Sequence, residues 1–324
     1  MTNKEKYAHF CEKNFVPIYS KSWWLDAICG AENWDVWICE NGGNIIAAMP
    51  YYVELRGQYK YITKVPLTQN NGIIFSHNSE GKPTSIAIQE EKIIFEVCEF
   101  ISSLKLDVYE QQFQTSFTNW LPFMWNGYSA ITRYTYIIED TSNLNDVWNN
   151  ITSKRRSVIK KGQRNSIYST DLSAEQFYEE HEKIYKKQGL LCPFSYDLWS
   201  RLKIACMAHD SGKISCRLTE DGNIAAVSFV VWDERSLYKI MGGTIPEYSK
   251  LDAYSALTWD EIELAHKLGI KYDFEGSVIK RISKSFREYG AEPMPYFRIR
   301  KVFNPDIIRE EAEYSIGRLK SIGE

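Results

Sequence analysis

One order of predicted elements occurs twice along the chain, and this repeat constrains the fold more than any other feature. A β-hairpin is predicted over residues 34–50 and a second over residues 215–227. Both contain Glu, then Asn-Gly or Asp-Gly, then Asn-Ile and Ala-Ala. Asn-Gly and Asp-Gly supply the positive φ angles that a tight turn between twisted strands requires. Two similar hairpins predict two copies of one α/β unit.

The same elements follow each hairpin in the same order. They are a strand (59–63 and 237–241), a long amphipathic helix (87–104 and 252–268) and a further strand (106–111 and 270–274). A chain of 324 residues with 44% hydrophobic content can bury two such cores. We therefore predict two domains, residues 1–142 and 143–324, because the polar run before residue 144 offers an N-cap for a new helix.

Composition limits the possible partners and cofactors. The net charge of −3 gives no overall attraction to DNA or to other nucleic acids. No apolar run resembles a secretory segment or reaches 18 residues, which predicts a cytoplasmic protein without stable membrane insertion. The seven cysteines form no CxxC pair and show no metal-ligand spacing with the five histidines. We therefore expect reduced thiols and no bound metal.

A predicted strand in the second half ends in a group of polar residues, Asp273-Phe274-Glu275-Gly276-Ser277. Asp273 and Glu275 would share one face because side chains alternate along a strand, and Gly276 would allow a sharp turn. Two interpretations remain open. The carboxylates form a site, or Asp273 caps a turn while Glu275 forms an exposed ion pair with Lys284 or Arg287.

A basic helix is predicted at the expected domain junction, where residues 154–164 contain six Lys and Arg residues. Such a charge run is often only a solvated helix face. Arginine, however, binds phosphate or carboxylate through two parallel hydrogen bonds. We hypothesise that Arg155 or Arg156 binds the pyrophosphate or carboxylate of an acceptor.

The element order resembles the core of GNAT acyltransferases, in which a splayed strand pair holds the acyl donor. In tandem it is similar to the FemAB superfamily, which includes FemX-type peptidoglycan aminoacyltransferases and related two-domain N-acyltransferases. Four segments in the family's order carry the resemblance. They are Ser153–Lys161 (Ser-x-x-Arg-x-x-Ile-x-Lys), the donor-side segments 238–243 and 252–259, Tyr272–Gly276 (Tyr-Asp-Phe-x-Gly) and Lys284–Gly290 (Lys-x-x-Phe-Gly).

The resemblance implies an α/β (α+β) fold of two tandem GNAT-like domains. Each would be a mixed, mostly antiparallel sheet flanked by helices, with an interdomain cleft and the active site in the second domain. It also implies transfer of an acyl group from acyl-CoA to a primary amine of a bacterial cell-envelope or polysaccharide precursor. The acceptor would be a small molecule or a sugar or peptide precursor.

The resemblance further suggests which residues form the site. Asp273 or Glu275 would be the base, Lys284 the cation facing an anionic substrate or developing negative charge, and Tyr254 the proton donor to the leaving group. The expected substrate-binding residues are Arg155, Arg156, Tyr238, Ser277 and Arg287.

The chain also departs from the family pattern. Residues 242–251 stand where GNAT enzymes have a glycine-rich pyrophosphate loop, so aminoacyl-tRNA is an alternative donor. The Lys-x-x-Phe-Gly segment ends as Tyr289-Gly290, so its register with the family is uncertain. A degenerate, non-catalytic ligand-binding or scaffold protein is a third possibility.

The first half is expected to have a supporting role. Residues 108–112, its counterpart of the second strand end, lack paired carboxylates, so we expect this half to form one wall of the cleft. The loop-like segment 63–85 would line an acceptor pocket.

Overall fold

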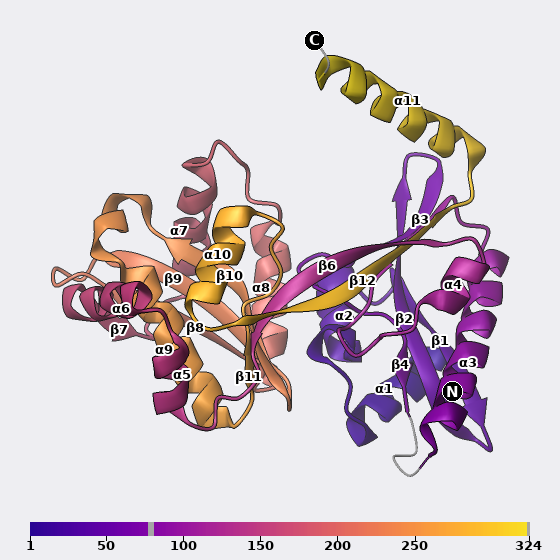
Figure 1. Ribbon diagram of the computed structural model, residues 1–324, viewed down its shortest axis with the longest axis horizontal. Coiled ribbons are helices and arrows are strands. Elements are labelled where there is room, and N and C mark those ends of the chain that lie inside the picture. Colours follow the sequence, from indigo (N-terminus) through magenta and orange to yellow (C-terminus); the bar gives the residue numbers. More distant parts are fainter. Residues whose placement is uncertain (77–80, 323–324) are drawn as a thin grey trace. The chain divides into compact units, whose positions relative to one another are not determined.

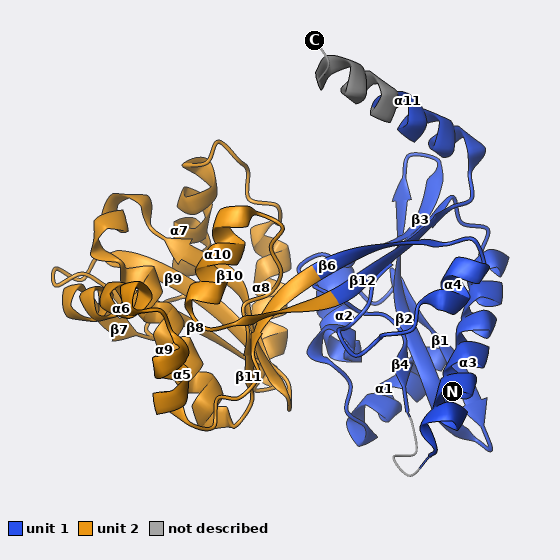
Figure 2. Ribbon diagram, viewed as in Figure 1, with its two compact units in different colours: residues 1–133, 296–324 blue, residues 134–295 orange. Residues whose placement is uncertain are grey.

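A computed structural model describes residues 1–76 and 81–322 (Figure 1). The chain forms two compact units, and Figure 2 shows them in different colours. Unit 1 contains residues 1–133 and 296–324, and unit 2 contains residues 134–295. This division differs from the linear boundary after residue 142. The reason is that the chain returns to unit 1 after Pro295, where its last strand pairs with a strand of the first half.

Unit 1 contains one sheet and its covering helices. Its elements in chain order are α1 (Asn3–Lys13), η1 (Ile18–Ser20), α2 (Ser22–Cys29), β1 (Trp34–Asn41), β2 (Asn44–Arg56), β3 (Tyr59–Thr63), β4 (Ile74–Phe75), α3 (Pro83–Ser103), β5 (Val108–Gln112), α4 (Leu121–Trp125), most of β12 (Glu292–Val302) and α11 (Pro305–Ile322). The strand order is β1-β2-β3-β5-β12, with β4 paired to β2. Only β3 and β5 are parallel among these described pairs.

Unit 2 repeats this plan. Its elements are α5 (Leu144–Asn150), α6 (Ser153–Asn165), β7 (Ile167–Ser169), α7 (Ala174–Lys186), α8 (Tyr196–Ala208), β8 (Gly212–Leu218), β9 (Ile224–Trp232), β10 (Ser236–Thr244), η2 (Pro246–Leu251), α9 (Ala253–Leu268), β11 (Lys271–Asp273) and α10 (Lys280–Glu288), after a strand β6 (Ser129–Ile138) that begins in unit 1. The strand order is β6-β11-β10-β9-β8-β7, and the β10–β11 pair is parallel. The predicted mixed, mostly antiparallel sheets flanked by helices are confirmed.

The sequence signals that predicted the repeat act as expected. Gly42 and Gly43 take positive φ angles between β1 and β2, and Gly222 does so between β8 and β9. Asn143 caps α5 by accepting a hydrogen bond from the backbone of Asn145. Helix α9 ends at Gly269, which has φ +69°. The two hairpins and the strand, helix and strand after each are therefore present, within a few residues of the predicted bounds.

Different helices pack against the two faces of the unit 2 sheet. Ile262 and Ala265 of α9 pack with Tyr272 of β11 in one buried cluster. On the other face, the rings of Phe177 (α7) and Trp199 (α8) contact Phe229 of β9. No helix in the described part of the chain has the length and hydropathy needed to cross a membrane.

The segment 63–85, between β3 and α3, was expected to be loop-like and to line an acceptor pocket, but its first part is buried in unit 1. Thr68, Gln69, Asn70 and Asn71 are all buried. The Gln111 amide nitrogen donates to the carbonyl oxygens of Pro50 (2.7 Å) and Asn71 (3.0 Å). These polar residues are buried because strand β5 supplies amide partners for them. Residues 77–80 of the segment lie outside the described residues.

Candidate functional site

The β10–β11 pair is short and ends at the polar residues singled out in the sequence. Three residue pairs hold the strands together, Ser236 with Lys271, Leu237 with Tyr272 and Tyr238 with Asp273. Strand β11 then ends, whereas β10 continues to Thr244. A register shift between Lys239 and Met241 also interrupts the pairing of β10 with β9. The parallel pair therefore stops at Tyr238 and Asp273.

Two glycines expected in a loop belong to the extended part of β10. A Cβ on Gly242 would lie 2.5 Å from the Val227 carbonyl oxygen, and one on Gly243 would lie 2.9 Å from Ile184 Cδ1. They allow β10 to pack closely against β9 and α7. The connection to α9 is therefore η2 and its neighbours, and no glycine-rich loop occurs there.

The Asp273 carboxyl group at the strand end is buried and has a perturbed pKa. Its side chain is only 4% exposed. Oδ1 accepts hydrogen bonds from the Thr135 hydroxyl and from the Glu275 backbone nitrogen (2.7 Å). Burial raises the pKa of Asp273 from 3.8 to about 7, despite the opposing effect of these two hydrogen bonds, and Glu139 and Asp233 raise it further. Among the described residues, none forms a hydrogen bond or ion pair with Oδ2.

Tyr238 and Asp233 lie beside Asp273. The Tyr238 hydroxyl donates to Asp233 Oδ2 at 3.2 Å. Burial raises the pKa of Tyr238, and the Asp233 and Asp273 carboxylates raise it further. Asp233 Oδ1 also accepts from the backbone nitrogens of Arg235 and Ser236, which holds the β9–β10 turn in place. The structure thus brings the predicted pair Tyr238 and Asp273 together.

The turn after β11 differs from the predicted one. Glu275, rather than Gly276, adopts the left-handed conformation, with φ +61°. Because the strand already ends at Asp273, Glu275 does not share a strand face with it. The hydrogen bond from the Glu275 nitrogen to Asp273 Oδ1 stabilises this turn, so Asp273 does act as a turn cap. Ser277 Oγ accepts from the Ile279 nitrogen at 3.1 Å and forms the next turn.

Tyr254 lies beside a cluster of buried polar side chains, Lys239, Glu261 and Tyr272, on the α9 side of the sheet. Lys239 forms an ion pair with Glu261 at 2.8 Å, with side chains that are 5% and 2% exposed. The Tyr272 hydroxyl donates to the same carboxylate oxygen at 2.7 Å. Lys239 Nζ lies 4.1 Å from the Tyr254 ring centroid. Tyr272 faces α9, so Asp273 faces the opposite side of the sheet, and the structure does not bring Tyr254 and Asp273 to one face.

Burial also affects the protonation of Tyr254. It raises the pKa of the phenol well above 10, and the Glu261 carboxylate adds to this increase. Tyr254 therefore stays protonated at neutral pH, as a proton donor must.

Lys284 and Arg287 are exposed on α10. Among the described residues, neither side chain has a hydrogen bond or ion pair, so the structure does not join Lys284 to Asp273. Their assigned roles in substrate binding stay predictions.

The two arginines of the basic helix contact other parts of unit 2. Arg155 forms an ion pair with Glu288 at 2.6 Å and donates to the hydroxyls of Ser255 (3.2 Å) and Ser285 (3.0 Å). Arg156 donates to three carbonyl oxygens at the end of α5, those of Trp148, Asn149 and Ile151. These contacts give both arginines a structural role. Their binding of an acceptor stays a prediction.

The N-terminal end of α9 is covered by α6. A Cβ on Gly162 would lie 2.4 Å from the Asp252 carbonyl oxygen. Lys161 Nζ donates to the Lys250 carbonyl oxygen at 2.8 Å and to Asp252 Oδ2 at 2.7 Å. An open pocket of about 700 Å³ adjoins this end, between Tyr248 and Leu251 on one side and Arg164 and residues 219–221 on the other.

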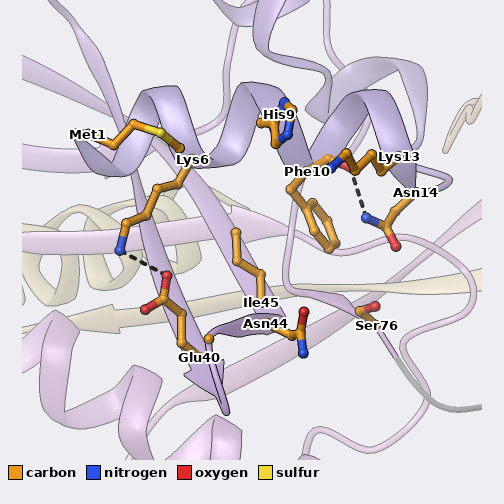
Figure 3. A pocket seen from close by; sticks show the side chains of 11 residues that line it. Met1, Lys6, His9, Phe10, Lys13, Asn14, Glu40, Asn44, Ile45 and Ser76 are labelled. Atoms are coloured by element: carbon orange, nitrogen blue, oxygen red, sulfur yellow. Dashed lines mark hydrogen bonds and ion pairs between the residues drawn. The ribbon is translucent and has the colours of Figure 1, made fainter.

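A second open pocket, of about 670 Å³, lies in unit 1 beside α1 (Figure 3). Two of its polar lining groups have partners in the protein, since Lys6 pairs with Glu40 at 2.9 Å and the Asn14 amide donates to the Phe10 carbonyl oxygen at 3.0 Å. This pocket contains none of the residues singled out in the sequence.

Sequence reasoning missed Thr135, Asp233 and the Lys239–Glu261 pair. Thr135 lies 138 positions before Asp273, and no local pattern distinguishes it from other strand threonines. Among residues 1–76 and 81–322, no three His, Cys, Asp or Glu side chains are grouped so that they could hold a metal ion.

Comparisons with known proteins bear on the domain family and the fold of this chain. Residues 145–281, which include β10, α9 and β11, match the acetyltransferase (GNAT) domain family. No curated protein matches the chain in sequence.

Solved structures share the fold at low sequence identity. FemX is 11% identical with a TM-score of 0.67, and the match covers 95% of this chain and 98% of FemX. L-PGS from Bacillus licheniformis is 10% identical with a TM-score of 0.55, covering 92% of each chain. A tandem GNAT protein from the clavulanic acid biosynthesis pathway is 7% identical with a TM-score of 0.51, covering 92% of each chain.

Proposed function

We propose that this chain, in which residues 145–281 match the GNAT domain family and whose fold is similar to that of FemX, transfers an acyl group from acyl-CoA to a primary amine of a cell-envelope or polysaccharide precursor. The observation that carries this proposal is the Asp273 carboxyl group at the end of the short β10–β11 pair. Its pKa of about 7 and its unpartnered Oδ2 suit a group that accepts a proton near neutral pH.

The chemistry requires that the attacking amine lose a proton. In the proposed reaction the amine nitrogen forms a bond to the acyl carbon, and the carbon–sulfur bond of the thioester breaks. Asp273 Oδ2 accepts the amine proton, directly or through one water molecule. The leaving thiolate takes its proton from water, because Tyr254, the residue predicted to donate it, lies on the α9 side of the sheet, opposite Asp273. Thr135 and the Glu275 backbone hold Oδ1, so the base keeps a fixed orientation.

The remaining predicted residues have secondary roles in this proposal. Lys284 and Arg287 offer exposed cations for the phosphates of donor or acceptor. Burial raises the pKa of Asp273, and the nearby Asp233 carboxylate, which accepts a hydrogen bond from Tyr238, raises it further. Ser277 supports the turn that follows the base, and Glu275 contributes its backbone nitrogen. The choice of an envelope acceptor rests on the fold shared with FemX and L-PGS.

One observation favours aminoacyl-tRNA as an alternative donor. GNAT enzymes bind the pyrophosphate of coenzyme A at the helix end that α6 covers here through Gly162 and Lys161. An aminoacyl ester needs no pyrophosphate site, because its phosphates are spread along a nucleic acid backbone. The base and the bond changes at the acyl carbon stay the same, and a ribose oxygen replaces the thiolate as leaving group.

The test is an assay for acyl transfer with the purified full chain. Acetyl-CoA and longer acyl-CoAs are supplied with amino sugars, UDP-linked amino sugars and lysine-containing peptides, and thiol release is measured. We expect activity with one acyl-CoA, with kcat/KM rising as pH increases through about 7 because Asp273 must lose its proton. Activity only with charged tRNA would select the alternative donor. Activity that falls as pH rises through 7 would remove Asp273 as the base.

A further inference from the structure

Helix α10 has a strongly cationic outer face. Lys280, Arg281, Lys284 and Arg287 are all exposed, and at 3.6 residues per turn they lie on one side of the helix. The opposite side packs against unit 2. There the Phe286 ring lies 4.8 Å from the Phe274 ring, centroid to centroid, and Ser283 Oγ lies 2.5 Å from the Tyr136 hydroxyl.

These four cations are not neutralised within the described part of the chain. None of their side chains has a hydrogen bond or ion pair there, whereas Glu288 of the same helix is bound to Arg155 at 2.6 Å. The whole chain carries a net charge of −3, so this concentration of positive charge is a local exception. Such a surface attracts a polyanion over a distance of about 8 Å at physiological salt.

Two aliphatic residues extend this face. Val278 and Ile279, immediately before the helix, are 75% and 51% exposed. Adjacent exposed aliphatic side chains beside cations are a combination typical of surfaces that bind at a membrane interface. An anionic lipid surface satisfies both groups, because its phosphates attract cations and its acyl boundary accepts aliphatic side chains.

We propose that residues 278–281 together with Lys284 and Arg287, the α10 basic face, bind peripherally to anionic lipid bilayers. Lipid is favoured over a nucleic acid backbone because the apolar members are aliphatic. Binding of single-stranded nucleic acid relies on aromatic rings that stack on bases. Lys284 and Arg287 of this face are also the cations proposed for phosphate binding in the transfer reaction, so the test below changes only residues 278–281 of this face. Binding at the bilayer surface requires no helix that spans the membrane.

The experiment measures partitioning of the full chain onto vesicles by co-sedimentation. Phosphatidylcholine vesicles are compared with vesicles that contain 30% phosphatidylglycerol. We expect binding to the anionic vesicles only, with loss of binding in 0.5 M NaCl. The double variant K280Q/R281Q should partition roughly twenty-five-fold less, since each cation near the surface contributes roughly fivefold. The double variant V278S/I279S should partition roughly tenfold less.

A matched control removes two exposed cations from another helix of the same unit. Lys186 and Lys187 lie at the end of α7, and K186Q/K187Q changes the net charge by the same amount as K280Q/R281Q. We expect it to bind like the unchanged protein. Circular dichroism spectra and melting temperatures confirm that all variants are folded. None of the changed residues belongs to the proposed catalytic group.

Three results would overturn the proposal. Equal binding to neutral and anionic vesicles would remove the charge argument. Equal losses in K280Q/R281Q and K186Q/K187Q would show a net-charge effect rather than a defined surface. Binding of an unacylated tRNA that depends on Lys280 and Arg281 but not on Val278 and Ile279, without binding to vesicles, would assign the face to nucleic acid.

Discussion

The two units contain the same strand arrangement, but the acidic residue in the second strand of the parallel pair has different surroundings in each unit. Each parallel pair has a second strand in which a buried tyrosine precedes an acidic residue, Tyr109–Glu110 in unit 1 and Tyr272–Asp273 in unit 2. Glu110 is paired with Arg298 (2.9 Å) and Arg300 (3.3 Å). Asp273 has no basic partner among the described residues; burial raises its pKa, and neighbouring acids raise it further.

The surroundings of the two strand ends differ in the same way. Beyond the unit 1 pair, buried residues 68–71 form part of the interior and bind the amides of β5. Beyond the unit 2 pair, β11 simply ends and β10 continues. One fold therefore supports a neutralised, filled strand end in unit 1 and a strand end with a buried carboxyl group of raised pKa in unit 2.

The largest expected effect concerns activity. Asp273→Asn should lower kcat/KM by roughly 10²–10⁴-fold, the usual contribution of a general base. The matched variant Glu110→Gln should leave kcat/KM within roughly threefold of the unchanged value, because our proposal gives that carboxylate no part in proton transfer. Steady-state kinetics at pH 8 measure both. Equal losses in the two variants would contradict a functional difference between the units.

The second prediction concerns the buried ion pair of unit 2. Lys239→Met leaves Glu261 charged and buried, and should lower the free energy of unfolding by roughly 3–5 kcal/mol. Adding Glu261→Gln should recover much of this loss, because the amide carries no charge and can still accept from Tyr272. In unit 1, Arg298→Met removes half of a more exposed pair and should cost about 1 kcal/mol. Urea unfolding measures each value.

The third prediction concerns pH. Native Asp273 keeps a proton that the unfolded chain releases, because its pKa is raised from 3.8 to about 7. The protonated Asp273 carboxyl group therefore contributes fully to the free energy of unfolding below pH 4, and this contribution is lost as pH rises through 7. Asp273→Asn should match the unchanged protein at pH 4 and exceed its stability at pH 9 by on the order of 4 kcal/mol. Melting curves across this range test it, and a gain at pH 4 alone would disprove the raised pKa.

The smallest effect concerns the filled strand end of unit 1. Gln111→Leu removes the donor to Pro50 and Asn71 and should lower the free energy of unfolding by about 1–3 kcal/mol. Activity per folded molecule should not change. If activity fell while stability did not, the unit 1 strand end would be part of the site. Gln114→Leu, at a less buried amide with a single backbone acceptor, is a control that should cost less.

The sequence by itself determined the repeat and most of its elements. Glycine and asparagine at turns and helix ends act through local backbone conformation, which neighbouring residues encode, so Gly42, Gly222, Asn143 and Gly269 predicted their elements correctly. The motif Tyr272-Asp273 also marked the right strand end. The order of elements sufficed to predict the GNAT-like fold.

Tertiary structure alone decided which polar residues meet. Thr135 reaches Asp273 from a strand 138 positions away, and the same sheet places Tyr272 and Asp273 on opposite faces. The neutralisation of Glu110 depends on a strand that returns from the far end of the chain. A carboxyl pKa depends on burial and on charges brought near by folding. The local sequence around Glu110 and Asp273 therefore could not reveal that Glu110 is paired with two arginines, whereas Asp273 is buried with a raised pKa.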